Sequence, residues 1–171
     1  MAFPEDPGDR YEVESFDFDQ DPPRLELMGS VYNSTDPDLS RFKSRGGKLI
    51  MTHGWADALV TPQRTLDYHA AVEKAMGGPA AVVDFYRLFM VPGTGHGEPE
   101  GSGVSLKDMD LLPSLEKWVE EGVAPDSLLT TKTDKEGKTL WTRPVCPHPQ
   151  VARYRGTGDP KDAASFDCAA P

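Results

Sequence analysis

Two side chains capable of acid–base chemistry follow two short apolar runs of this sequence. Asp57 comes soon after the run that ends at Gly54, and His96 comes soon after the run that ends at Val91. A histidine that moves a proton and a carboxylate that orients it are two of the three members of a serine-hydrolase triad. The spacing therefore predicts that Asp57 is the orienting acid and His96 the base.

The third member of such a triad, a nucleophilic serine, is not evident. Its usual place is a Gly-x-Ser-x-Gly turn that precedes the acid and the base along the chain. The 171 residues contain no such motif. Ser102 and Ser105 both follow His96, against the expected order, and neither is expected on a strand-to-helix turn. An independent hydrolase that uses one of these serines is thus the less favoured interpretation.

Each candidate side chain also has an ordinary structural interpretation. Asp57 could cap the helix after it, and His96 could be a surface residue of a glycine-rich loop. His53 is expected to line a pocket floor or to bond the backbone rather than to act as a base. His69 and His148 receive no role, because no grouping of histidines with cysteines has the spacing of zinc ligands. The order of the acid and the base on successive strands favours the triad.

The elements that must position this pair follow a regular order. Residues 48–54 and 86–91 are apolar runs typical of buried parallel strands. A helix is expected after each of them, which makes a βαβα unit over residues 47–125. Functional side chains of such sheets lie just beyond the carboxyl ends of the strands. The predicted fold class is therefore α/β, with Asp57 and His96 at one edge of a parallel sheet.

Helix signals support this order. The first helix is expected to begin at Pro62, with Thr61 as its cap, and to end at Gly77. The second is expected to begin near Asp108 or Asp110 and to end at Gly122, and Pro113 favours the later start. Their expected core faces are Tyr68, Val72, Ala75 and Met76 in the first helix, and Leu111, Leu115, Trp118 and Val119 in the second.

Residues 1–46 are polar and rich in proline, which predicts an extended or helical arm. Residues 13–19 alternate like a strand or an extended segment. A short helix is expected around Pro22–Gly29, and a capped turn of helix at 36–42 with Asp36 as the cap. The start of the chain has neither the basic nor the apolar region of a signal peptide.

Residues 126–171 show little periodicity and are predicted as an irregular tail, with a hairpin around 134–138. Both cysteines, Cys146 and Cys168, lie in this tail. Two thiols 22 residues apart fit a disulfide of a secreted protein, and two free thiols are the alternative.

Composition limits the class of partner. The chain has 18 Lys and Arg against 28 Asp and Glu, a formal charge of −10. Binding to nucleic acid or to an anionic membrane needs clustered cations, so neither partner is expected. No run approaches the roughly 20 apolar residues of a membrane span. The acidic excess is more simply a feature that favours solubility.

Several motifs together resemble the tannase and feruloyl esterase family. They are His53–Asp57, Phe89–His96, Trp118–Pro125, Arg143–Tyr154 and Ala163–Cys168. The resemblance covers most of the chain. It implies the C-terminal part of an α/β-hydrolase fold, in which the arm 1–46 would be the end of a lid region or a linker.

The resemblance also implies an activity. Such enzymes are secreted serine esterases that cleave phenolic esters, such as feruloyl or galloyl esters, and they bind calcium in a large lid. By position, Asp57 would be the triad acid, His96 the triad base, and Cys146 with Cys168 a disulfide. The calcium is expected in the lid, with no cofactor in this chain. The remaining partners would be a small phenolic ester and the N-terminal half of the enzyme.

Two departures from the family pattern qualify this expectation. The serine, the oxyanion donors, the lid and the calcium ligands of the family all lie upstream of the residues present here. The family also places a cysteine directly after the catalytic histidine, where this chain has Gly97. We therefore expect a C-terminal fragment that is inactive alone. The alternative is a non-catalytic binding module derived from such an esterase.

Overall fold

The computed structural model describes residues 12–98, 103–109 and 111–171. It divides the chain into two compact units, with the boundary between Asp36 and Pro37. The boundary expected from the composition lay ten residues later, after residue 46.

The first unit consists of short helical turns. Two 3₁₀ turns, Val13–Ser15 and Pro22–Leu25, precede helix α1 (Glu26–Tyr32). The helix expected near Pro22 is thus present and is longer than predicted. Residues 13–19 do not form the expected strand, because the carboxylate of Asp17 accepts hydrogen bonds from two backbone N–H groups just after it and closes a turn.

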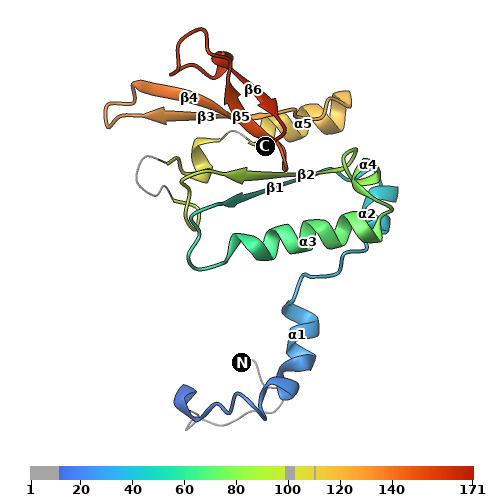
Figure 1. The fold of residues 1–171 in the computed structure, drawn as a ribbon. Coiled ribbons are helices and arrows are strands. Elements are labelled where there is room, and N and C mark those ends of the chain that lie inside the picture. The colour runs from blue at the N-terminus through green and yellow to red at the C-terminus, as the bar shows by residue number, and fades with distance from the viewer. Residues whose placement is uncertain (1–11, 99–102, 110) are drawn as a thin grey trace. The chain divides into compact units, whose positions relative to one another are not determined.

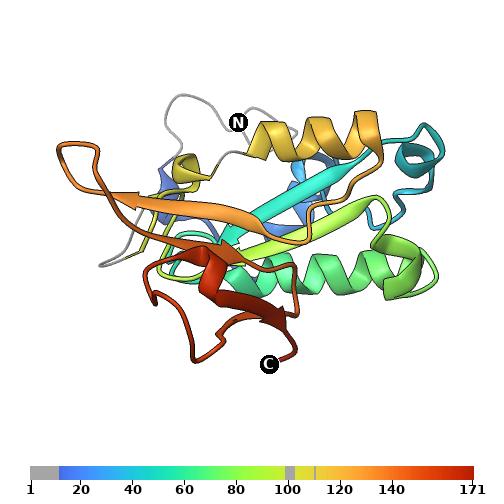
Figure 2. The ribbon, with the colours of Figure 1, turned by 90° about the horizontal axis from the view of Figure 1, so that it is seen from above.

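The second unit is built on two parallel strands, as predicted. Strand β1 (Leu49–Gly54) pairs with β2 (Tyr86–Val91), in register from their first to their last residues. Helix α3 (Pro62–Ala75) connects them, and α5 (Leu111–Glu121) follows β2. Figures 1 and 2 show α3 on one face of this sheet and α5 on the other. The expected βαβα unit is confirmed.

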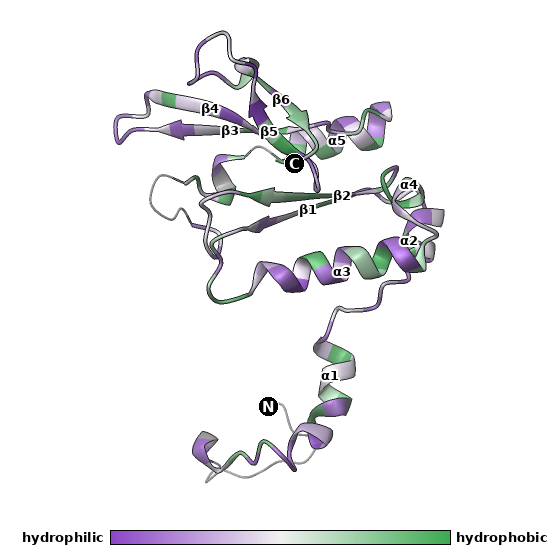
Figure 3. Cartoon of the chain, viewed as in Figure 1, coloured by the Kyte–Doolittle hydropathy of each residue, from purple (hydrophilic) through white to green (hydrophobic). Residues whose placement is uncertain are grey.

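Strand β2 is hydrophobic on both faces, as a covered parallel strand requires (Figure 3). Tyr86, Leu88 and Met90 belong to the cluster that includes Val72 of α3. The alternate side chains of β2 point the other way. Of these, Phe89 and Val91 belong to a second cluster. Its other members are Val104, Met109, Leu128 and Val145. The sheet is therefore covered by two separate cores, one on each face.

Helix α3 has the predicted ends. Pro62 is its first residue, and Gly77, with φ of +93°, adopts the left-handed conformation that ends it. The side chain of Thr61 makes no capping hydrogen bond. Ala75 is exposed, while His69 is buried beside Val72. The buried face is centred on these two residues, and Ala75 lies outside it.

A short helix, α4 (Pro79–Val82), follows Gly77 and Gly78 and was not expected. Helix α5 begins at Leu111, the later of the predicted starts, and Gly122 with φ of +73° follows its end. Trp118 is buried as expected, but Val119 is 58% exposed, so the apolar stripe of α5 is narrower than predicted.

Helix α2 (Ser40–Ser44) begins later than the sequence suggested. The carboxylate of Asp38, rather than that of Asp36, accepts a hydrogen bond from the backbone N–H of Ser40. The helix belongs to the second unit, because Lys43 donates from Nζ to a carbonyl of α4.

The C-terminal residues are more regular than predicted. Strands β3 (Leu128–Thr133) and β4 (Thr139–Val145) form an antiparallel hairpin, and β5 (Val151–Tyr154) pairs antiparallel with β6 (Phe166–Ala169). The turn predicted at 134–138 joins β3 to β4. These four strands are difficult to predict from the sequence, because β5 and β6 are short and β4 contains a proline.

The disulfide predicted between Cys146 and Cys168 is present, with the two Cα atoms 5.5 Å apart. It links the end of β4 to β6. Among the helices that the structure describes, none is long and apolar enough to cross a membrane.

Candidate active site

The loops that follow β1 and β2 are joined at their bases. Gly54 ends β1, and a Cβ atom there would lie 2.0 Å from the carbonyl oxygen of Thr94. Only glycine permits this approach. The backbone N–H of Ala56 then donates to the same carbonyl over 3.0 Å, and that of Trp55 donates to Val91 over 2.9 Å. These contacts bring the two loops side by side.

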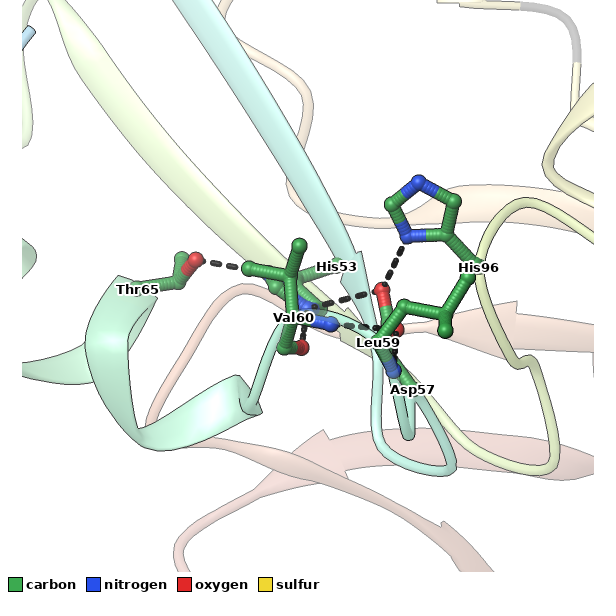
Figure 4. Close-up of polar contacts among 6 residues, drawn as sticks. All are labelled: His53, Asp57, Leu59, Val60, Thr65 and His96. Carbon is green, nitrogen blue, oxygen red and sulfur yellow. Dashed lines mark hydrogen bonds and ion pairs between the residues drawn. The ribbon is translucent and has the colours of Figure 1, made fainter. Parts of the chain in front are cut away.

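The loops bring Asp57 and His96 into direct contact. Nδ1 of His96 lies 2.9 Å from Oδ2 of Asp57 (Figure 4). The Asp57 side chain is 5% exposed, whereas the imidazole of His96 is 57% exposed. Nε2 of His96 makes no hydrogen bond with any residue that the structure describes. The structure thus places together the two residues that the sequence singled out.

Asp57 is held in its ionised form. Its Oδ1 accepts hydrogen bonds from the backbone N–H groups of Leu59 and Val60, each over 2.9 Å. The Val60 N–H contributes most to lowering the pKa of Asp57 to about 2, and His96 adds to this, while burial opposes it. A carboxylate is therefore present at neutral pH. It accepts a hydrogen bond from Nδ1–H of His96, so that in the neutral ring Nε2 has a lone pair that can accept a proton.

His53 contacts the same carboxylate. Its Nε2 lies 3.3 Å from Oδ2 of Asp57 and 3.0 Å from the carbonyl oxygen of Val60, and its Nδ1 lies 2.6 Å from Oγ1 of Thr65. The side chain is 11% exposed. His53 thus bonds the backbone, as expected, and it also approaches Asp57, which was not expected.

The loop that carries His96 is anchored by its own residues. Thr94 is fully buried and donates from Oγ1 to the carbonyl of Val104 over 2.6 Å. Ser105 donates from Oγ to the carbonyl of Gly97 over 2.8 Å. The backbone on both sides of His96 is therefore fixed to residues 104–105.

Ser105 is not placed as a nucleophile. Ser105 is 2% exposed, and its hydroxyl is directed to the Gly97 carbonyl rather than to the imidazole of His96. Ser102 lies outside the described residues.

The other histidines lie away from this site. His69 is 3.7 Å from Glu73, and its ring centre is 5.9 Å from that of His148. In the part of the chain that the structure describes, no three His, Cys, Asp or Glu residues are grouped so that they could hold a metal ion.

An open depression borders the pair, with His96, Val60 and Leu106 on its walls. Large apolar side chains are exposed near Asp57: Trp55 at 49%, Leu59 at 79% and Val60 at 44%. The arrangement offers a base directed to an open surface, an acid behind it and apolar contacts around it.

The sequence did not indicate the two backbone N–H groups that donate to Asp57, or the contact between His53 and Asp57. The two N–H groups follow Asp57 by two and three residues, which is the spacing of an Asx turn. That spacing could have indicated them. The approach of His53 to Asp57 depends on how the loop folds back, and no local signal shows it.

Comparison with known proteins gives a consistent result. The family model described as "Tannase and feruloyl esterase" matches residues 7–169. The chain is 43% identical over 150 residues to a probable feruloyl esterase of Arthroderma benhamiae, covering 85% of this chain and 27% of that protein. It is 39% identical over 166 residues to the mono(2-hydroxyethyl) terephthalate hydrolase of Piscinibacter sakaiensis, covering 91% and 26%.

Solved structures agree with this. The crystal structure of feruloyl esterase B from Aspergillus oryzae matches with a TM-score of 0.77 and 26% identity, over 94% of this chain and 34% of that one. The chain has the α/β fold of the matching part of these esterases. It spans 27% and 26% of the lengths of the two relatives above.

Proposed function

This chain belongs to the tannase and feruloyl esterase family, and on that basis we propose that it supplies the acid and the base of a serine carboxylic ester hydrolase. The observation that carries the proposal is the 2.9 Å contact between His96 Nδ1 and Asp57 Oδ2, with His96 Nε2 left to the open side. The nucleophilic serine would come from outside these 171 residues, because the sequence contains no serine elbow.

In the proposed reaction, His96 Nε2 takes the proton of the serine hydroxyl while the serine oxygen attacks the ester carbonyl. The imidazolium that forms is stabilised by the ionised Asp57. His96 then gives the proton to the leaving alcohol, and an acyl-enzyme remains. Water, deprotonated by the same nitrogen, releases the acid and restores the serine.

We propose phenolic esters, of the feruloyl or galloyl type, as substrates. The similarity of this chain to a probable feruloyl esterase supports this class, and so do the exposed apolar side chains beside Asp57, which suit an aromatic acid. The feature that selects one phenolic acid over another would lie outside these residues, in the lid of the whole enzyme.

The exposed edge of the sheet at β1 supports the proposal that a further segment of the enzyme packs beside it. Among the described residues, β1 has one hydrogen-bonded neighbour, β2, and most of its residues are partly exposed. Parallel sheets are normally covered and extended on such edges. A segment that carries the serine would have a place to add beside β1.

We propose a secreted location for the whole enzyme. The Cys146–Cys168 disulfide supports it, because such bonds persist in oxidising compartments.

A chimera tests the proposed function. These 171 residues replace the matched segment of the Arthroderma benhamiae relative, and the chimera and the isolated chain are assayed with methyl ferulate and methyl gallate. We expect turnover by the chimera and none by the isolated chain. A chimera with native-like circular dichroism but no activity would favour a non-catalytic module. Turnover by the isolated chain would contradict the proposal that the nucleophilic serine lies outside these 171 residues.

A further inference from the structure

His53 lies outside the acid–base pair, yet both of its ring nitrogens are engaged. The imidazole is at the end of β1, with 11% of the side chain exposed. Nδ1 is 2.6 Å from the hydroxyl of Thr65, at the start of α3, and Nε2 is 3.0 Å from the carbonyl oxygen of Val60 (Figure 4). The ring therefore bridges the end of β1, the loop 55–60 and the first turn of α3.

The partners of the ring determine where its proton lies. The carbonyl of Val60 can only accept a hydrogen bond, so Nε2 must carry a proton. The same N–H lies 3.3 Å from Oδ2 of Asp57, which is also an acceptor. The hydroxyl of Thr65 can donate to Nδ1 when the ring is neutral. The neutral form of His53 therefore carries its proton on Nε2.

His96 must hold the opposite tautomer. It donates from Nδ1 to Oδ2 of Asp57, so in the neutral ring Nε2 is the unprotonated nitrogen. One carboxylate oxygen therefore faces an Nδ1–H from His96 and an Nε2–H from His53. If His53 carried its proton on Nδ1, its Nε2 lone pair would face two oxygen atoms and repel both.

The backbone of Val60 links the two groups. Its N–H donates to Oδ1 of Asp57, and its carbonyl accepts from His53. His53 thus holds the residue whose N–H in turn holds Asp57. Loss of the His53 donor would free the Val60 carbonyl and loosen one of the two backbone bonds to the carboxylate.

We propose that His53, as the neutral Nε2–H tautomer, is a positioning residue that fixes Val60 and Asp57 so that the carboxylate selects the Nδ1–H tautomer of His96. Its relevance to catalysis rests on the proposed function. The arrangement of the tautomers does not, because it can be measured in this chain without any turnover.

The test is ¹⁵N NMR of the imidazole rings in the full 171-residue chain at about pH 8.5, where ordinary histidines are neutral. We expect a protonated Nε2 at His53 and a protonated Nδ1 at His96. In His53→Gln, an amide N–H can replace the Nε2 donor, and His96 should keep its tautomer. In His53→Leu the donor is lost, and His96 should shift toward the Nε2–H form.

His69→Leu is the matched control, because His69 is equally buried but contacts Glu73 and His148 instead. It should leave the His96 signals unchanged. The proposal is wrong if His53→Leu also leaves them unchanged, if His53→Gln disturbs them as much as His53→Leu, or if His53 itself carries its proton on Nδ1.

Thr65→Val provides a test that does not alter His53 itself and keeps the shape of the neighbouring side chain. The Nδ1 signal of His53 should move to the position of an unbonded nitrogen while Nε2 stays protonated. An unchanged Nδ1 signal would contradict the assignment even if His53→Leu does not fold. None of these results depends on whether the chimera hydrolyses esters, so the two proposals can fail separately.

Discussion

At the scale of single residues, Asp57 organises the site. Four N–H groups face its two oxygens: those of Leu59 and Val60 at Oδ1, and those of His96 and His53 at Oδ2. The contacts from Val60, His96 and Leu59 lower the pKa of Asp57, so that the carboxylate remains ionised although it is buried. A neutral acid in this place could not select the tautomer of His96.

The lowered pKa of Asp57 predicts a dependence of stability on pH. The folded pKa of Asp57 is about 2, below its ordinary value of 3.8, so the ionised group stabilises the fold above about pH 4. As the pH falls from about 4 to about 2, the unfolded state takes up the proton first and this contribution is lost. In urea unfolding, the difference in unfolding free energy between the wild type and Asp57→Asn should therefore shrink over that range. A difference that is constant from pH 6 to pH 2 would contradict the prediction.

Asp57 and His96 could be predicted as a pair because each follows an apolar strand and they stand in the order of a triad. Their contact at 2.9 Å follows from the parallel register of β1 and β2. The contacts of His53 could not be predicted in the same way. They depend on the loop 55–60 folding back over the strand end, which is a tertiary arrangement.

At the scale of elements, the loop that carries His96 must hold its shape by hydrogen bonds. The family resemblance led us to expect a cysteine directly after this histidine, and this chain has Gly97 there instead. Thr94 and Ser105 fasten the loop at two points, and Lys132 of β3 donates from Nζ to the carbonyl of Gly103. The hairpin β3–β4 thus supports the active-site loop.

Thr94→Val should destabilise this loop. The substitution keeps the shape of the side chain but leaves the buried carbonyl of Val104 without its donor, at a cost of about 1–3 kcal/mol. Urea unfolding measures the loss, and amide exchange at residues 94–97 should accelerate. Thr139→Val, at an exposed position of β4, is the control and should change stability by less than about 0.5 kcal/mol. Equal effects of the two substitutions would count against a special role of Thr94.

The elements were predictable to different degrees. Helices α3 and α5 carry proline at or near their starts and glycine after their ends, and their bounds followed from those residues. The strands β3 to β6 carry mixed polar and apolar residues, and two of them are four residues long. The turn at 134–138 indicated the pairing of β3 with β4. Strands β5 and β6 pair across residues 155–165, and local periodicity did not show that pairing.

At the scale of the whole molecule, the disulfide secures the C-terminal strands. Cys146 follows β4 and Cys168 lies in β6, so the bond closes a segment that packs few large apolar side chains. Its 22-residue separation predicts a stabilisation of about 3 kcal/mol in the chain-entropy model.

The double variant Cys146→Ser/Cys168→Ser should lower the unfolding free energy by about this amount. Dithiothreitol should destabilise the wild type to a similar degree and should leave the double variant unchanged. Urea unfolding with and without the reductant measures both effects. A wild type that is insensitive to full reduction, verified by thiol titration, would show that the bond adds no stability.

The measurement that bears most directly on the proposed function is the kcat of the chimera with Asp57→Asn. The substitution keeps the shape of the side chain but removes the charge that selects the tautomer of His96. We predict a fall in kcat of about 10⁴-fold, as in serine-hydrolase triads generally, and a comparable fall for His96→Ala. Asp126→Asn, whose side chain is 96% exposed, should change kcat little. An unchanged kcat in Asp57→Asn would contradict the assignment of the acid and with it the proposed mechanism.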